Sequence, residues 1–100
     1  MKYKIKIYPF AERDLKDIVT YLNTLSPQAA LSYYNKLVAA IMNLSTMPTR
    51  CPLVKDLALR VKGYRFLLVG SYVVFYVVVL DTVQIRRILY KKRNYLDVLK

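Results

Sequence analysis

Apolar and polar positions change their spacing along the chain, and each spacing predicts a different kind of element. Segment 2–8, KYKIKIY, alternates lysine with apolar residues, which is the period of a β-strand with one solvated face. Lysines along one side are typical of an edge strand, because their charge discourages pairing with other chains. Pro9 ends this run. We therefore expect the chain to open with an edge strand.

From residue 11 the apolar positions recur every three to four residues, the period of one buried helix face. The pattern runs to residue 25 and is interrupted by Ser26 and Pro27, which are preferred types at an N-cap and at the first helical position. It then resumes as far as residue 44, and Pro48 follows. Because the joint between the two segments is short, we predict an antiparallel helical hairpin.

The next part of the chain carries weaker signals. Segment 49–59 mixes proline, a cysteine and charges, and we interpret it as a loop. Segment 59–69 predicts one strand, or two short ones interrupted near Gly63. A turn is expected at Gly70, because glycine next to serine is typical of a turn between two strands.

Segment 72–80, YVVFYVVVL, is apolar at every position, as expected for a central strand with both sheet faces covered. A strand over 83–90 and a short helix over 95–99 complete the pattern. The predicted order is β-α-α-β-β-β, a single α+β domain over 1–100. We expect the helical hairpin to pack on one face of an antiparallel sheet that the first strand joins.

Composition narrows the range of functions. Apolar residues make up 56% of the chain, which is enough for a core, and the formal charge of +11 favours an acidic or polyanionic partner. There is no histidine, and Cys51 is the single cysteine, so we expect neither a disulfide nor a metal or other cofactor. The uncharged run 66–80 is shorter than the roughly 20 residues that span a bilayer. We therefore predict a cytoplasmic protein without membrane insertion.

Candidate chemistry gathers near the C-terminus, where every charged residue from 84 to 95 is basic. Bases interleaved with tyrosines are typical of a surface that binds phosphates and stacks on nucleobases. The alternative is a solvated strand end with a basic tail, and the residues alone leave both interpretations open. The residues concerned are Arg86, Arg87, Tyr90, Lys91, Lys92, Arg93 and Tyr95.

Other sites are disfavoured by the spacing of their residues. Cys51 has no histidine to activate it, so an idle buried thiol is the better interpretation. The carboxylates of Glu12, Asp14 and Asp17 are spread round a helix by their spacing of two and three residues, with Arg13 and Lys16 between them, and we interpret them as a polar helix face. Tyr33 and Tyr34, at helical spacing, are expected to have packing roles, and Tyr76 is expected in the core.

The order of motifs along almost the whole chain resembles the RelE/ParE superfamily of bacterial type II toxin-antitoxin toxins, with ParE-like members closest. The resemblance is carried by Pro9-x-Ala11-x-x-Asp14-Leu15 in the first helix, Ser26-Pro27-x-Ala29 in the second, Tyr64-Arg65 and Val69-Gly70-x-Tyr72 in the central hairpin, and Arg87-Ile88-Leu89-Tyr90-x-x-Arg93-x-Tyr95 at the end. It implies a growth-arresting, plasmid-stabilising toxin that a cognate acidic antitoxin neutralises.

The resemblance leaves two targets open. ParE-like members poison DNA gyrase, whereas RelE-like members are enzymes that cleave messenger RNA in the ribosomal A site. For cleavage, the resemblance implies catalytic roles for Arg65, Lys92, Arg93 and Tyr95. It implies target binding by the remaining bases of the last strand and turn, which are Arg86, Arg87 and Lys91, together with Tyr90.

One departure from the family pattern bears on this choice. Cleaving members carry an arginine in the strand after the turn, where this chain has Val73 or Val74. This difference favours gyrase as the target, with mRNA cleavage as the alternative. An inactive binding module of the same fold is the third possibility.

Overall fold

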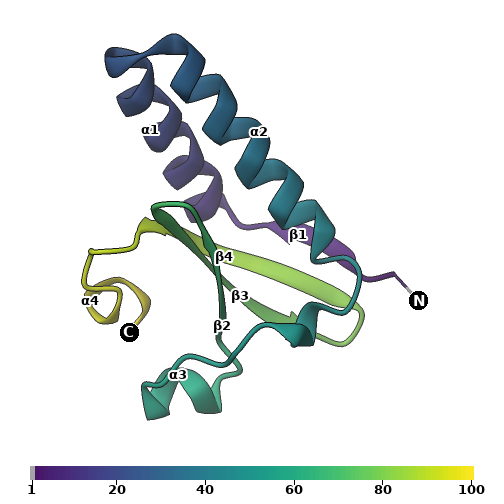
Figure 1. Cartoon of the computed structure of the whole chain (residues 1–100). Coiled ribbons are helices and arrows are strands. Elements are labelled where there is room, and N and C mark those ends of the chain that lie inside the picture. The colour runs from purple at the N-terminus through teal and green to yellow at the C-terminus, as the bar shows by residue number, and fades with distance from the viewer. Residues whose placement is uncertain (1) are drawn as a thin grey trace.

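The computed structural model describes residues 2–100, and Figure 1 shows two long helices side by side above a twisted sheet. The predicted order β-α-α-β-β-β and the α+β class are confirmed, with a 3₁₀ turn and two short helices in addition. In chain order the elements are β1 (Lys4–Ile7), α1 (Pro9–Leu25), α2 (Pro27–Asn43), the 3₁₀ turn η1 (Pro48–Arg50), α3 (Leu57–Val61), β2 (Arg65–Val69), β3 (Tyr72–Val79), β4 (Thr82–Tyr90) and α4 (Leu96–Leu99).

The sheet has the strand order β1-β4-β3-β2, so β1 and β2 form its edges. Strand β3 runs antiparallel to both of its neighbours, β2 and β4, as expected of strands joined by short turns. Strand β1 pairs in parallel with β4, with Ile5 beside Val83, and the sheet is therefore mixed. The hairpin and two other strands separate β1 from β4 in sequence, so no tight turn dictates their relative direction.

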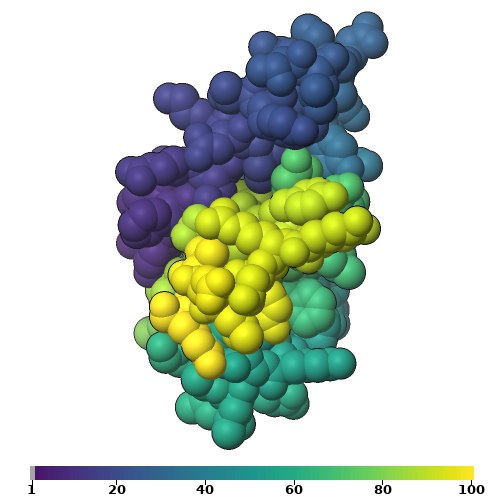
Figure 2. Space-filling view, turned by 90° about the vertical axis from the view of Figure 1, so that its left-hand side faces the viewer, coloured from purple at the N-terminus to yellow at the C-terminus, as the bar shows by residue number. Residues whose placement is uncertain are grey.

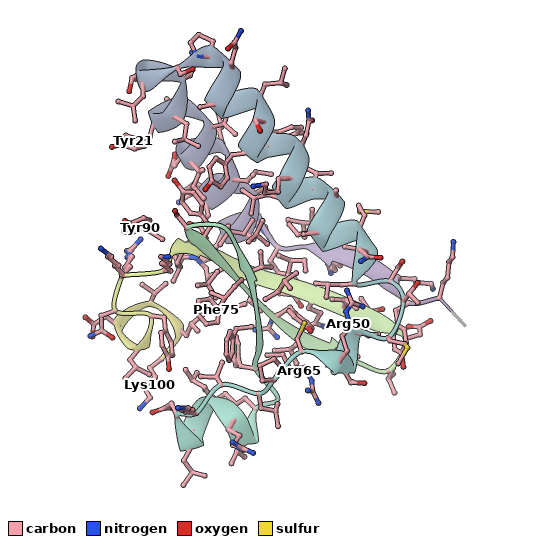
Figure 3. All side chains as sticks on the ribbon, in the orientation of Figure 1. Tyr21, Arg50, Arg65, Phe75, Tyr90 and Lys100 are labelled. Atoms are coloured by element: carbon pink, nitrogen blue, oxygen red, sulfur yellow. The ribbon has the colours of Figure 1, made fainter. Side chains whose placement is uncertain are left out.

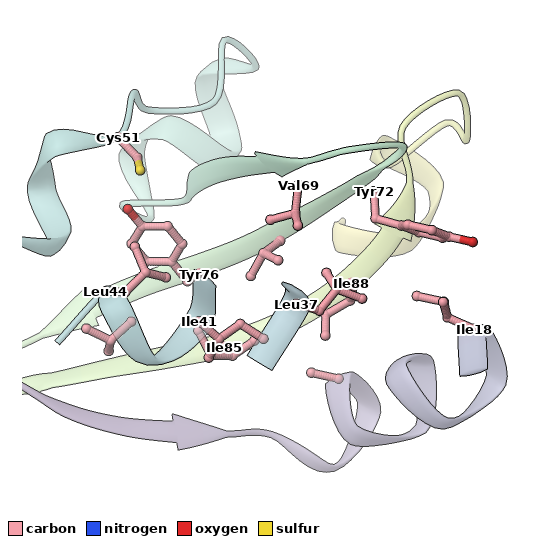
Figure 4. Packing of buried hydrophobic residues seen from close by; sticks show 13 residues of the cluster. Ile18, Leu37, Ile41, Leu44, Cys51, Val69, Tyr72, Tyr76, Ile85 and Ile88 are labelled. Atoms are coloured by element: carbon pink, nitrogen blue, oxygen red, sulfur yellow. The ribbon is translucent and has the colours of Figure 1, made fainter. Parts of the chain in front are cut away.

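The hairpin of α1 and α2 covers one face of the sheet (Figure 4). Ser26 is the N-cap predicted for α2, since its hydroxyl accepts a hydrogen bond from the Ala29 N–H at 3.2 Å, and Pro27 is the first helical residue. Tyr76 is fully buried in this layer, as predicted, and its hydroxyl donates to the Pro48 carbonyl. The buried residues of this layer are Ala11, Ile18, Leu37, Ile41, Leu44, Cys51, Val69, Tyr72, Val74, Tyr76, Val83, Ile85 and Ile88.

The opposite face of the sheet is covered only in part, by the segment around α3 and by the C-terminal residues. Strand β3 is consequently buried on both faces along most of its length, which confirms the prediction for 72–80. The buried residues of this second layer are Val54, Leu59, Tyr64, Val73, Phe75, Val77 and Leu89. None of the helices among residues 2–100 combines the length and the apolar content that crossing a bilayer requires.

The expectation for residues 57–61 was wrong, because this segment is the short helix α3 and not a loop followed by a strand. The Asp56 carboxylate accepts a hydrogen bond from the Leu59 N–H at 3.1 Å and so acts as the helix N-cap. Leu59 is fully buried against β3, and this burial offsets the loss of conformational entropy on ordering a single helical turn. Gly63, with φ +87°, then turns the chain into β2.

Gly70 occupies the most constrained glycine position, at the turn between β2 and β3. Its φ is +60°, and a Cβ built there would lie 2.7 Å from the Tyr33 hydroxyl. We expect Gly70→Ala to lower the free energy of unfolding by roughly 1–3 kcal/mol from backbone strain, and further from the contact with Tyr33. Urea denaturation checks this value. Gly63→Ala is the matched control, because its Cβ would lie 3.6 Å from Val77 and only strain remains. Equal losses in the two variants would show that the Tyr33 contact has no effect.

Candidate functional site

A groove of about 210 Å³ lies on the sheet face opposite the hairpin, near the end of β4. Its floor comes from alternate residues of β2 and β3, because successive side chains of a strand point to opposite faces. Leu68, on the edge strand β2, is 60% exposed there. The lining residues are Val54, Lys55, Phe66, Leu68, Val73, Phe75, Tyr90, Lys91, Arg93 and Tyr95.

The cationic wall of this groove follows directly from the way β4 ends. The Lys91 N–H donates to the Ser71 carbonyl at 2.9 Å, and the Arg93 N–H donates to the Tyr90 carbonyl at 2.9 Å. These two backbone bonds hold a turn that keeps the side chains of residues 91–94 exposed. The Tyr95 ring then packs on Phe75, with ring centroids 5.1 Å apart. The groove therefore has an aromatic floor and a basic rim.

The C-terminal segment is fixed to the other wall by an ion pair between Lys100 Nζ and Asp56 Oδ1 at 3.0 Å. Hydrogen bonding from Lys100, and then from the Leu59 N–H, lowers the pKa of Asp56 below its usual value. We expect Lys100→Ala to move this pKa part of the way back up, because the contact with Leu59 remains. A carboxyl NMR titration measures it. An unchanged Asp56 pKa would mean that the ion pair is not formed in solution.

Tyr90 stands at the end of β4 with 47% of its surface exposed. Its ring meets Tyr72 edge-on, with centroids 6.0 Å apart, and Tyr72 meets Tyr33 in the same way at 5.4 Å. Burial raises the pKa of Tyr72, so this residue remains a neutral phenol at physiological pH. Tyr90 is thus supported from behind while one side of its ring faces solvent.

Arg87 is engaged within the protein. Its guanidinium donates to both oxygens of Asp14, at 2.7 and 2.8 Å, and the Ile88 N–H donates to the same carboxylate at 2.9 Å. Hydrogen bonding to Asp14 raises the pKa of Arg87. Asp14 was interpreted as one carboxylate of a polar helix face, but only 11% of its side chain is exposed and it pairs with Arg87. The reason lies in the topology: β1 ends at Ile7, and α1 takes its place along the edge of β4.

Arg86 is likewise held by neighbours, at a bulge where Phe75 faces Arg87 and Tyr76 faces Ile85. Its guanidinium lies 4.8 Å from the Tyr8 ring centroid and donates to the Gln84 side-chain oxygen at 2.8 Å. Arg86 and Arg87 were both expected to contact a target. The structure places them in contacts that stabilise the sheet.

Arg65 lies away from the other residues of the expected catalytic set. It faces Tyr76 in the β2–β3 register, so it belongs to the hairpin side of the sheet, and it donates to the Cys51 carbonyl at 2.6 Å. In Figure 3 Arg65 lies near Arg50, at the opposite end of the sheet from Tyr90. Arg93 and Tyr95 do share the groove, whereas Lys92 is exposed in the turn beside it.

Figure 2 views the side of the molecule where these groups gather, with the yellow C-terminal segment between the purple α1 and the teal region of α3. The groove is also lined by residues that were not predicted as site residues from the sequence, namely Val54, Lys55, Phe66, Leu68 and Phe75. The alternation of β2 would have been the signal for two of them.

Among residues 2–100, His, Cys, Asp and Glu side chains form no group of three that could hold a metal ion. The arrangement is suited to binding an anionic, partly apolar partner.

Comparison with known proteins gives a family and a fold. The sequence matches the family model described as the ParE toxin of the type II toxin-antitoxin system, parDE, over residues 5–95. A search of curated proteins found no match. Among solved structures, a chain of the chromosomal ParDE toxin-antitoxin system from P. aeruginosa superposes with a TM-score of 0.75 at 22% identity, covering 89% of this chain and 96% of that one.

A second solved structure shows the same likeness of fold. A chain of the RelBE2 toxin-antitoxin complex from Mycobacterium tuberculosis superposes with a TM-score of 0.66 at 20% identity. The superposition covers 90% of this chain and 99% of that one.

Proposed function

Because the chain belongs to the ParE toxin family of type II toxin-antitoxin systems, we propose that it arrests bacterial growth by poisoning DNA gyrase. A cognate acidic antitoxin holds it inactive. The observation that carries the proposal is the family match over residues 5–95 together with the groove, whose basic rim surrounds an aromatic floor.

The geometry supports a target other than the RNA phosphodiester bond. Cleavage by a neighbouring 2′-hydroxyl needs one group to accept a proton and another to protonate the leaving oxygen. Of the four candidates, Arg65 lies on the far side of the sheet, and the Tyr95 ring rests on Phe75. The two positions at which cleaving members would carry an arginine are valines here: Val73 lines the groove and Val74 is in the core. These positions supply cations and apolar surface, which suit binding to a protein.

The same groove supports the antitoxin as a partner. Leu68 presents an exposed apolar side chain at the edge of β2, and Lys55, Lys91 and Arg93 stand around it. An amphipathic segment with carboxylates beside apolar residues would bury the leucine and pair with the cations. The net charge of +11 speeds the approach of such an acidic partner.

Three assays separate the possibilities. Expression of the chain alone should stop growth, and co-expression of the neighbouring acidic reading frame should restore it. The purified chain should inhibit supercoiling by gyrase, with no cuts in a defined message during in vitro translation. Cuts in the ribosomal A site would instead establish mRNA cleavage. Normal growth at confirmed expression would identify an inactive binding module.

A further inference from the structure

A second pocket, of about 220 Å³, opens between α1 and the end of β4. Tyr90 and Arg93 line it and also line the groove, so they form a wall between the two depressions. The pocket is smaller than the roughly 300–1,000 Å³ typical of sites for drug-sized ligands. It therefore suits one flat ring system.

Two tyrosines border the opening of this pocket. Tyr21 comes from α1 and is 60% exposed, and Tyr90 comes from β4 and is 47% exposed. Figure 3 shows Tyr21 above Tyr90 on the same side of the molecule. Tyr72 and Ile88 form the floor, and Tyr72 supports the Tyr90 ring edge-on. Two exposed phenol rings beside an apolar floor offer surfaces on which a planar ligand stacks.

The charged residues of the pocket narrow the choice of ligand. The Asp14 carboxylate is already bound to Arg87 and to the Ile88 N–H. Asp17 is exposed at the rim and supplies a hydrogen-bond acceptor, and Arg93 is exposed on the other side and supplies a cation. A nucleotide whose base carries an exocyclic amino group matches both charges and both rings.

We propose that this pocket binds one unstacked, amino-bearing nucleobase of a single-stranded nucleic acid. The base stacks between Tyr21 and Tyr90, its amino group donates to Asp17, and Arg93 contacts a flanking phosphate. Lys91 and Lys92, in the adjacent turn, extend the path of the phosphate backbone. The site goes beyond the proposed function, which names no nucleic-acid ligand, and it adds Tyr21 and Asp17 to residues that it shares with the groove and the basic turn.

Fluorescence anisotropy with the full-length chain tests the site directly. The probes are fluorescein-labelled decamers of deoxycytidine, deoxyuridine and abasic deoxyribose phosphate, which differ in the base while keeping the phosphates. The deoxycytidine decamer should bind about tenfold or more tightly than the abasic chain, as expected for base stacking. It should also bind more tightly than deoxyuridine, which has an oxygen in place of the amino group. A cytidine decamer then shows whether RNA or DNA is preferred.

Tyr21→Ala should remove the advantage of deoxycytidine over the abasic chain, and Tyr21→Phe should retain it. Tyr34→Ala is the matched control, since Tyr34 is 43% exposed on the hairpin outside the pocket. Equal binding of the base-bearing and abasic chains, or an unaffected Tyr21→Ala variant, would overturn the proposal. Equal binding of deoxycytidine and deoxyuridine would overturn the role of Asp17. Growth arrest is scored separately, so a failure here leaves the proposed function standing.

Discussion

Replacing Asp14 with alanine is expected to lower the free energy of unfolding by about 3 kcal/mol, the lower end of the range for breaking a buried ion pair. The variant leaves the guanidinium of Arg87 without its carboxylate in a place where only 20% of that side chain is exposed. It also leaves the Ile88 N–H without an acceptor at the edge of β4. Both losses fall at the contact that joins α1 to the sheet. Urea denaturation followed by circular dichroism measures the change.

Asp17→Ala is the matched control for this prediction. It removes the same charge from the same helix, but the Asp17 side chain is exposed. Substitutions at exposed positions usually change stability by less than about 0.5 kcal/mol. Similar losses for Asp14→Ala and Asp17→Ala would show that net charge, and not the contact with Arg87, sets the stability.

The combined substitution of Lys91, Lys92 and Arg93 by alanine is expected to abolish growth arrest while leaving the fold intact. We expect each of the three cations to make one charge-assisted hydrogen bond with the target, and at about 1.5–3 kcal/mol for each bond their joint loss lowers affinity by several orders of magnitude. The side chains are exposed, and the backbone bond from Lys91 to Ser71 is retained in the variant. Colony counts after induction, with circular dichroism of the purified variant, provide the measurement.

Three lysines near the N-terminus provide a control with the same change in net charge. Lys4 and Lys6 in β1, at the far edge of the sheet from β2, and Lys2 just before that strand are replaced by alanine. This variant should remain toxic. If both triple variants lose toxicity, the total positive charge is what the target recognises. If neither does, the C-terminal cations play no part in the activity.

The fold followed from the sequence wherever one pattern, a helical period or an unbroken apolar run, extended through a whole element. The two helices and the central strand β3 have such patterns, and Ser26 with Pro27 marked the start of α2. The short helix α3 escaped prediction because it has a single turn, which is too short to show helical periodicity. The parallel pairing of β1 also escaped, since strand direction across a long connection is set by tertiary packing.

For the site, the sequence predicted only which residue types would gather there. Bases and tyrosines near the end of β4 indicated a binding surface, and the groove includes Tyr90, Lys91, Arg93 and Tyr95. The sequence could not tell which bases remain available to a partner. That depends on contacts such as Asp14 with Arg87, which are 73 residues apart in the chain. It also depends on which sheet face receives Arg65, and the strand register fixes this.

The position of β1 has a consequence for biosynthesis. Its only strand neighbour within residues 2–100 is β4, the last strand to be translated. The helical hairpin relies on contacts between residues close in sequence, so it can form early on a nascent chain. The N-terminal strand must wait for residues 82–85 before it finds its register. Shorter nascent fragments therefore lack both the complete four-stranded sheet and the basic turn. The fold is completed only when the residues that we expect to bind the target have been synthesised.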